Sequence, residues 1–264
     1  MKNIKHTFVV LAYKESVYLE ECIKSVLNQK YKSKVVIATS TPNEFIYNLA
    51  RKYNLKVIVN KGEKGIGNDF DFAIKQGKTD LVTVAHQDDI YDYEYSYDVV
   101  NKYNKYNDSI ILFTDYYEIK NDKKEYSNKN LKIKRILLLP LKFHKFANLK
   151  LNKRLPLALG CSVCCPAVCF NIKKIKFPVF SSNYKCDVDW NAWEKLSKLN
   201  GRFIFINKNL MGHRIHEEST TTEIIKDNIR TKEDYDILQR FWPKPIAKII
   251  SKVYAKSENN NNIN

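Results

Sequence analysis

Short apolar segments alternate with helix-like segments across about the first 90 residues of the chain. The apolar segments are rich in Val, Ile and Leu, which is typical of strands that are buried on both faces of a sheet. The pattern predicts an α/β fold in which a mostly parallel central sheet carries helices on both faces. The predicted strands are residues 6–13, 34–40, 55–60 and 80–85.

Two helices between these strands are predicted from their apolar spacing. In the first, apolar residues recur three and four positions apart at Leu19, Cys22, Ile23, Val26 and Leu27. The second begins at "TPNE", where Thr41 is expected as N-cap, Pro42 at the first helical position and Glu44 as the partner of a capping box.

The pattern loosens beyond residue 108. Residues 109–119 predict a further strand, Trp190 to Leu199 a helix, and residues 202–207 a strand. Residues 226–256 are expected to form basic amphipathic helices, and residues 257–264, "SENNNNIN", a disordered tail.

The formal net charge is +16, and it is concentrated in two segments. Residues 131–154 contain eight Lys or Arg and no acid, and residues 240–256 contain five and no acid. In both segments the cations alternate with Leu, Ile and Phe, which favours a membrane surface over a nucleic acid. The apolar stripe of the last helix can lie on an anionic membrane or dock on the chain's own domain; it comprises Ile246, Ile249, Ile250 and Val253.

The chain has no stretch long and apolar enough to be a transmembrane helix, and its first residues do not resemble a signal peptide. We therefore expect a cytoplasmic protein that contacts the inner face of the cell membrane peripherally. Cys161 and Cys164 have the spacing of half a zinc site, but without a second half-site we interpret the cysteines of "GCSVCCPAVCF" as packed thiols.

Adjacent carboxylates follow the fourth predicted strand, in "HQDD" at residues 86–89. Ligands bind beyond the carboxyl ends of the strands in open α/β sheets, so Asp88 and Asp89 are placed in a ligand crevice. Paired carboxylates suit Mg²⁺ or Mn²⁺, and an imidazole of His213 or His216 can complete such a site. The alternatives are a solvated Asp-Asp turn and two ordinary surface histidines.

A second carboxylate pair stands in "CDVDW", residues 186–190. Asp187 can cap the following helix, and Asp189 then lies in its first turn beside the tryptophans. A carboxylate next to apolar rings can serve as a general base. Capping and packing alone explain the segment equally well.

Several pieces, taken in order, resemble a family 2 glycosyltransferase of the Rossmann-like GT-A fold, of the type that builds bacterial polysaccharides. The resemblance covers roughly residues 6–225. The pieces are "VVLAYKESVYLEECIKSVLNQKY", "GIGNDFDFAI", "VAHQDDIY", "DVDWNAWEKL" and "HRIHEEST". It implies a GT-A domain over residues 1–225, with a nucleotide-sugar half (1–108) and an acceptor half (109–225).

The resemblance also implies roles for particular residues. The donor nucleotide is expected to contact Ala12, Tyr13, Glu15, Thr39, Ser40, Asp69 and Asp88. Relatives carry an acid after the second strand, and this chain has none there. Gln87 replaces the first acid of the family's metal motif, so Asp89 is expected to be the main metal ligand. His213 is expected as a second ligand, with His216 as the alternative. Asp189 falls at the position of the catalytic base.

These roles imply a metal-dependent, inverting hexosyltransferase. It would use Mn²⁺ or Mg²⁺ to move a sugar from a nucleoside-diphosphate donor, a UDP-sugar in the first instance, to a glycan or lipid-linked acceptor in the synthesis of a cell-surface polysaccharide. No nucleic-acid partner is expected. Two alternatives remain, a sugar-phosphate nucleotidyltransferase and a basic membrane- or nucleic-acid-binding module. The first would need a glycine-rich phosphate loop where the chain has "AYKESVYLEE".

Overall fold

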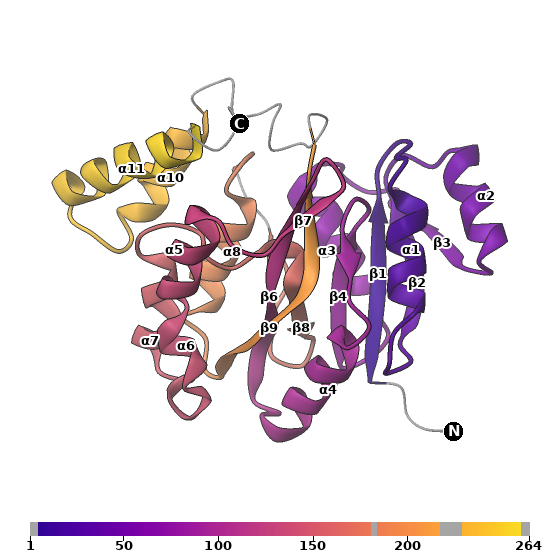
Figure 1. The fold of residues 1–264 in the computed structure, drawn as a ribbon, viewed down its shortest axis with the longest axis horizontal. Coiled ribbons are helices and arrows are strands. Elements are labelled where there is room, and N and C mark those ends of the chain that lie inside the picture. The colour runs from indigo at the N-terminus through magenta and orange to yellow at the C-terminus, as the bar shows by residue number, and fades with distance from the viewer. Residues whose placement is uncertain (1–4, 181–183, 217–228, 260–264) are drawn as a thin grey trace.

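A computed structural model describes residues 5–180, 184–216 and 229–259 (Figure 1). Its centre is a single nine-stranded sheet in the order β3-β2-β1-β4-β8-β6-β9-β5, with β7 paired to β6. The strands are β1 (His6–Ala12), β2 (Lys34–Thr39), β3 (Lys56–Val59), β4 (Leu81–His86), β5 (Ile90–Tyr91), β6 (Ser109–Lys120), β7 (Lys123–Glu125), β8 (Val168–Asn171) and β9 (Arg202–Ile215).

The sheet is mostly parallel, as predicted. Strands β1 to β4 run parallel to one another, and β6 runs parallel to β9. The antiparallel strand β8 lies between β4 and β6, and the short strands β5 and β7 are antiparallel to β9 and β6. In Figure 1, α1 lies in front of the sheet and α3 behind it, as right-handed crossovers require when the strand order reverses. The α/β fold with helices on both faces is confirmed.

The helices of the first half follow the predicted alternation, and those of the second half are mostly short. The α-helices are α1 (Leu19–Leu27), α2 (Glu44–Lys52), α3 (Ile66–Gln76), α4 (Tyr95–Lys105), α5 (Lys129–Leu137), α6 (Leu139–Lys142), α7 (Lys150–Arg154), α8 (Val188–Leu196), α10 (Ile229–Leu238) and α11 (Lys244–Asn259). Three 3₁₀ turns occur at His144–Phe146, Leu155–Leu157 and Cys165–Ala167.

The start of α2 differs from the prediction. Asn43 is the N-cap, and its side chain accepts a hydrogen bond from the backbone N–H of Ile46 at 2.9 Å. Thr41 does not cap the helix, and its hydroxyl instead accepts a hydrogen bond from the backbone N–H of Lys14 at 2.6 Å. That bond joins the loop after β1 to the loop after β2.

Strand β9 is longer than predicted. The expected strand of residues 202–207 continues to Ile215, so His213 lies within the strand and not after it. Residues 207–209 are polar and exposed, which is why the sequence suggested an end there. The pairing of β6 with β9 shifts register near Thr114 and Asp115 and then continues to Lys120. One strand therefore connects the core to the site described below.

The C-terminal helix α11 packs on the domain with a face that shares only Ile250 with the predicted stripe. Ala247 is fully buried, and Ile250 and Tyr254 pack against the core. Ile249 and Val253 of the predicted stripe are each 65% exposed. The helix also continues to Asn259, three residues into the predicted tail, and residues 260–264 lie outside the described part of the chain.

Two further expectations can be compared with the described residues. None of the described helices is long and apolar enough to cross a membrane. The cysteines are free thiols; Cys169 is in the core, and Cys161, Cys164 and Cys165 are half-buried and pack against it. The interpretation of these cysteines as packed thiols is thereby supported, since no described group containing them has the spacing of a metal site.

Candidate active site

The predicted nucleotide-side residues gather at the carboxyl edge of the sheet. The strand register pairs Ala12 with Thr39, Thr39 with Val59, and Leu11 with His86. Tyr13, Ser40 and Gln87 directly follow three of these strands, so they begin the loops above the same edge. Glu15 lies in the loop after β1 and is exposed.

Gln87 connects two of these loops. Its side-chain oxygen accepts a hydrogen bond from the backbone N–H of Tyr13 at 2.9 Å, and its side-chain nitrogen donates to the carbonyl of Tyr13 at 3.0 Å. An acid could not make both bonds, because a carboxylate only accepts. Gln87 thus holds the loop after β4 against the end of β1.

Ser40 and Asp69 meet over the ends of β2 and β3. Ser40 Oγ donates to one carboxylate oxygen of Asp69 at 2.9 Å, and Asn60 Nδ2 donates to the other at 2.7 Å. Asp69 comes from the first turn of α3 and is buried. The chain has no acid directly after β2, and α3 places a carboxylate beside that strand end. Asn60 was not predicted to take part.

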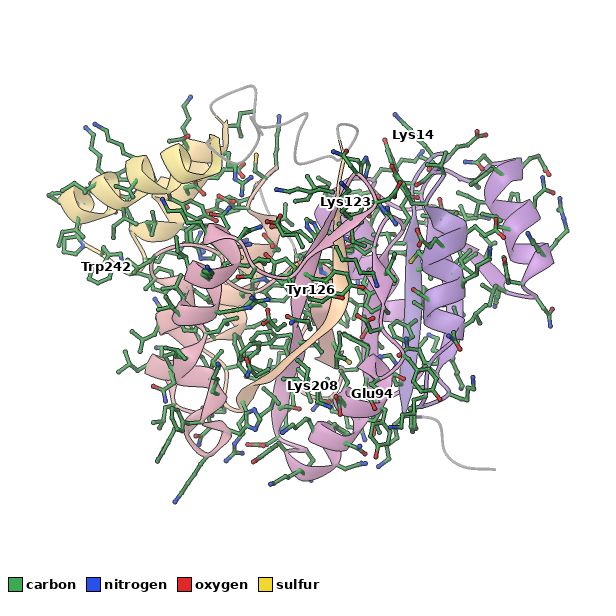
Figure 2. All side chains as sticks on the ribbon, in the orientation of Figure 1. Lys14, Glu94, Lys123, Tyr126, Lys208 and Trp242 are labelled. Atoms are coloured by element: carbon green, nitrogen blue, oxygen red, sulfur yellow. The ribbon has the colours of Figure 1, made fainter. Side chains whose placement is uncertain are left out.

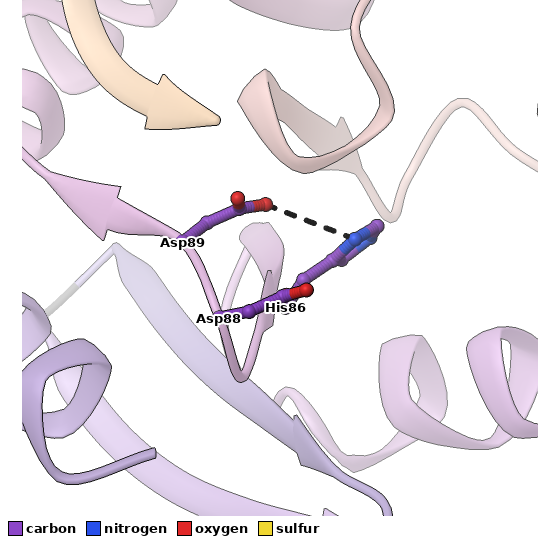
Figure 3. Close-up of side chains that lie close together, drawn as sticks. All are labelled: His86, Asp88 and Asp89. Carbon is purple, nitrogen blue, oxygen red and sulfur yellow. Dashed lines mark ion pairs between the residues drawn. The ribbon is translucent and has the colours of Figure 1, made fainter. Parts of the chain in front are cut away.

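Three side chains after β4 form a group that suits a metal ion (Figure 3). His86, Asp88 and Asp89 each offer a ligand atom, and these atoms lie within 4.8 Å of one another. His86 Nδ1 is 3.9 Å from Asp89 Oδ2. His86 was missed in the sequence because it ends the buried strand, although its position beside the carboxylates was a usable signal.

Two polar atoms of this group make no hydrogen bond within the described fold. His86 Nε2 and Asp89 Oδ2 are buried and have no hydrogen-bond partner among the described residues. Buried polar atoms normally have a partner, so an unsatisfied imidazole nitrogen and carboxylate oxygen in one group are open to binding a cation. Two carboxylates with one imidazole suit Mn²⁺, and carboxylates with water suit Mg²⁺. The residues present therefore fit a divalent cation.

Arg214, at the end of β9, fixes the carboxylate pair from the other side. Its backbone N–H donates to Asp89 Oδ1 at 2.9 Å, and its Nε donates to the carbonyl of Asp88 at 3.1 Å. The rest of the guanidinium forms ion pairs with Glu21 and Asp122. Arg214 was not predicted, because its partners are more than 90 residues away in the sequence.

The two histidines of β9 have different positions. His216 Nε2 is 3.0 Å from Asp88 Oδ2. His213 is half-buried further down the strand, beside the ring of Tyr116, and does not belong to the three-residue group. His216 therefore reaches the carboxylates directly, and His213 acts on Asp88 only through its charge. Residues 217–220 of "HRIHEEST" lie outside the described residues.

Burial and neighbouring groups set the protonation of the group. Burial lowers the pKa of His86 to about 4, so its ring is neutral near pH 7 and one of its two nitrogens has a lone pair that can bind a cation. Burial would raise the pKa of Asp88, but the hydrogen bond with His216 and the nearby His86 and His213 lower it overall. Burial and the charge of Asp88 raise the pKa of Asp89 well above its usual range. A divalent cation would stabilise both carboxylates in the charged form.

Asp189 stands in the first turn of α8, as predicted. Its Oδ1 accepts a hydrogen bond from the backbone N–H of Trp190 at 2.7 Å, and the thiol of Cys161 is 3.7 Å from its Oδ2. Burial raises its pKa above the usual range. Burial raises the pKa of the thiols of Cys164 and Cys165 well above the usual range, and the charges of Asp189 and Asp89 raise it further.

Helix α10 binds the chain at the N-terminal end of α8, the helix that carries Asp189. The carboxylate of Glu233 accepts backbone hydrogen bonds from Lys185 at 2.8 Å, Cys186 at 2.8 Å and Asp187 at 3.0 Å, all at the N-terminus of α8. Asp187 occupies the N-cap position, as predicted, but its side chain makes no capping bond. An acid from another helix therefore binds the backbone N–H groups of the three residues that lead into α8, and its charge lies at the positive end of that helix.

The other end of α8 is fixed by ion pairs. The carboxylate of Glu194 is fully buried and pairs with Arg154, Lys198 and Arg240. Arg240 follows α10, and its side chain also donates to Asn191 Oδ1 at 2.8 Å. The C-terminal extension thus contacts α8 near both of its ends and contributes to the position of Asp189.

The chain is similar to known glycosyltransferases. The family model described as glycosyl transferase family 2 matches residues 7–171. An uncharacterized glycosyltransferase of Rickettsia typhi is 23% identical over 257 residues, which are 92% of this chain and 72% of the relative.

Solved structures share the fold at low sequence identity. Residues 1–349 of TarS from S. aureus, in complex with UDP-GlcNAc, align with a TM-score of 0.62 and 15% identity, over 94% of this chain and 70% of TarS 1–349. The mannosyltransferase PcManGT from Pyrobaculum calidifontis, in complex with GDP-Man and Mn²⁺, aligns with a TM-score of 0.61 and 12% identity, over 96% of this chain and 69% of PcManGT.

The family match decides between the alternatives raised by the sequence. It spans more than half of the chain and includes the strand ends, the His86–Asp89 group and β8. The nucleotidyltransferase and the non-enzymatic binding module are not supported by it. The chain belongs to glycosyl transferase family 2 and has its GT-A fold.

Proposed function

We propose that this glycosyltransferase moves a sugar from a nucleoside-diphosphate donor, a UDP-sugar in the first instance, to a hydroxyl of a glycan or lipid-linked acceptor, with inversion at the anomeric carbon. The cell-surface polysaccharide pathway and a peripheral position at the inner face of the membrane are part of the proposal. The observation that carries it is the His86–Asp88–Asp89 group at the carboxyl edge of the sheet, which suits a divalent cation in a chain of this family. The half-buried acid Asp189 is the candidate base.

The donor would lie over the carboxyl edge of β1 to β4. The loops that begin at Tyr13 and Ser40 would border its base and ribose, with Glu15 nearby and the carboxylate of Asp69 available beside β2. Two solved structures of similar fold contain nucleotide sugars, UDP-GlcNAc in TarS and GDP-Man in PcManGT, which supports a donor of this class.

Asp88, Asp89 and His86 would hold Mn²⁺ or Mg²⁺, with His216 bonded to Asp88. A cation bound there would supply positive charge to the diphosphate leaving group as the bond to the sugar breaks. The protein contributes the position of the ligands, since Arg214 fixes Asp89 and Gln87 fixes the loop that contains Asp88. A Mn²⁺ ion in the PcManGT complex supports the choice of metal.

Asp189 would take the proton from the acceptor hydroxyl, which attacks the anomeric carbon from the side opposite the diphosphate. Its burial raises its pKa, so it is a stronger base than an exposed aspartate. In this arrangement the carboxylate of Asp189 would contact only the acceptor. The cation held by His86, Asp88 and Asp89 would contact only the donor.

A panel of nucleotide sugars tests the proposal. We expect hydrolysis or transfer of a UDP-sugar that needs Mn²⁺ or Mg²⁺, loss of donor turnover in Asp89→Ala, and retained donor binding with loss of transfer in Asp189→Asn. The matched control is Glu44→Gln, which changes an exposed carboxylate on α2. The proposal fails if no donor is bound or if Asp89→Ala behaves like the control, and transfer by Asp189→Asn would remove Asp189 as base.

A further inference from the structure

Exposed apolar side chains are concentrated at one end of the molecule. Among the described residues, twelve of the eighteen exposed large apolar or aromatic side chains belong to residues 133–159 or to α11. The most exposed of the twelve are Ile136, Phe143, Leu151, Ile249 and Val253, each between 63% and 69% exposed. Isolated exposed apolar residues are normal, but a concentration of this size marks a binding surface.

The two segments lie next to one another at one end of the molecule. In Figure 1, α5, α6, α7 and α11 lie at the end of the long axis away from α2 and β3. The turn after α7 joins them, because Trp242 Nε1 donates to the carbonyl of Ala158 at 2.6 Å and the ring of Tyr254 lies against Gly160. Figure 2 shows the side chains of α11 and Trp242 at this end. We call this surface, α5 to Leu159 together with α11, the basic apolar face.

The charge of this face is of one sign. Residues 126–186 and 237–257 contain no acid. Eight exposed lysines accompany the apolar side chains on the face among the described side chains, namely Lys129, Lys132, Lys142, Lys145, Lys150, Lys244, Lys248 and Lys252. Apolar side chains with lysines around them are the composition of protein surfaces that bind anionic bilayers.

We infer that the basic apolar face binds the surface of an anionic phospholipid bilayer, with α11 and the α5–α7 segment inserted together at the level of the head groups. A symmetric dimer through this face would bring the lysines of two copies together, which disfavours a second copy. Nucleic acid is disfavoured because ten of the twelve exposed apolar side chains are aliphatic and offer no stacking surface. The location of the acceptor at the bilayer rests on the proposed function. Binding of the chain to the bilayer does not depend on turnover.

Sedimentation of the full chain with vesicles tests the inference. Vesicles of phosphatidylcholine with 30 mol% phosphatidylglycerol are compared with pure phosphatidylcholine at low and high salt. We expect binding to the anionic vesicles only, weakened by salt. Removing two lysines in Lys248→Gln/Lys252→Gln should lower the partition coefficient about 25-fold, because each lysine near the surface contributes about fivefold.

Two variants test whether both segments take part. Ile249→Ser/Val253→Ser on α11 and Phe143→Ser/Leu151→Ser on the other segment should each lower partitioning about tenfold or more. Val17→Ser is the matched control, because Val17 is 84% exposed and lies outside the face. Circular dichroism and donor turnover without vesicles should be unchanged in the α11 variant, so that loss of vesicle binding is separated from unfolding and from failure of the proposed chemistry.

Three outcomes would overturn the inference. They are equal binding to both kinds of vesicle or to neither; a dimer in analytical ultracentrifugation that Ile249→Ser/Val253→Ser dissociates, without vesicle binding; and retention of a single-stranded oligonucleotide in place of vesicles. Donor turnover with no vesicle binding would reject this inference and the peripheral membrane position but leave the proposed transfer reaction intact, and vesicle binding with no turnover would reject only the proposed transfer reaction.

Discussion

Gln87 and Tyr13 are joined by two hydrogen bonds, one in each direction between the side-chain amide and the backbone. The pair links the loop of the carboxylates to the end of β1, 74 residues earlier. The sequence suggested that Gln87 stands where an acid would bind metal. The structure gives it a different use, which an acid at the same place could not provide.

An acid in place of Gln87 should therefore destabilise the fold. Gln87→Glu keeps the shape and the acceptor but loses the donor to the carbonyl of Tyr13, so we expect the free energy of unfolding to fall by about 1 kcal/mol. Mn²⁺ affinity should not increase. Chemical denaturation measures the first effect and a Mn²⁺ titration the second. Tighter Mn²⁺ binding in the variant would contradict this prediction and show that position 87 belongs to the metal site.

His86 should be necessary for metal binding although the sequence did not suggest it. We expect EDTA to abolish donor turnover and Mn²⁺ to restore it. In His86→Ala, Mn²⁺ should bind at least about tenfold more weakly when measured with a nucleoside diphosphate present. His144→Ala is a matched control, because His144 bonds to the carbonyl of Phe205 in another part of the fold. Equal Mn²⁺ affinity of the two variants would exclude His86 as a ligand.

The thiol of Cys161 should tune the pH dependence of transfer. Its contact with Asp189 lowers the pKa of that carboxyl, against the larger effect of burial, which raises it. In Cys161→Ala this contact is lost, so the acidic limb of the plot of log kcat/KM against pH should move to higher pH. Cys161→Ser keeps a hydroxyl donor, and its limb should stay in place or move to lower pH. Identical profiles for all three proteins would separate Cys161 from the function of Asp189.

Glu233 should act as a positioning residue. Glu233→Gln removes the negative charge from the N-terminus of α8 but keeps one acceptor, and we expect a loss of about 1–2 kcal/mol in unfolding free energy. Because α8 carries Asp189 and no donor contact, kcat should fall while KM for the nucleotide sugar stays within about twofold. Steady-state kinetics separate the two constants. A rise in donor KM with constant kcat would contradict this role, and Glu44→Gln again serves as control.

The buried acid Asp187 should make stability depend on pH. Burial and the neighbouring Asp234 raise its pKa to about 10. The folded state then holds a proton that the unfolded state has lost above about pH 4, so the stabilisation is complete below pH 4 and is lost as pH rises toward 10. One such group changes the unfolding free energy by up to ~1.4 kcal/mol per pH unit.

Asp187→Asn removes this dependence. We expect the variant to be less sensitive to pH between 5 and 9 and to gain stability relative to the native chain at the alkaline end. Urea denaturation at several pH values provides the measurement. Parallel stability curves for the two proteins would mean that Asp187 is ionised in the folded chain.

The sequence was most informative where neighbours in space are also neighbours in the chain. The strands from His6 to His86 are nearly continuous apolar runs, so both their type and their common carboxyl edge follow from the sequence. Asp189 in the first turn of α8 follows from local spacing in the same way. The predicted N-cap of α2, Thr41, is two residues before the observed N-cap, Asn43. The hydrogen bond between Thr41 and Lys14 joins two separate loops, so it cannot be inferred from the sequence of the helix alone.

The remaining site depends on contacts between distant segments. Arg214 contacts Asp89 across 125 residues, and Glu233 reaches the backbone of Asp187 across 46. The polar residues 207–209 hid the continuation of β9, since exposure in the middle of a strand resembles its end. The apolar stripe of α11 was read from periodicity, but which side of a helix packs depends on Gly160 and Trp190, which its own sequence does not reveal.

The length of β9 has a consequence for how this chain can change during evolution. Successive residues of a strand point to opposite sides, so inserting or deleting one residue before Arg214 would reverse every side chain beyond that point. Arg214 would turn away from the carboxylates even though no active-site residue had been replaced. We expect relatives to vary in this strand by substitution, with changes in length confined to the loops at its two ends.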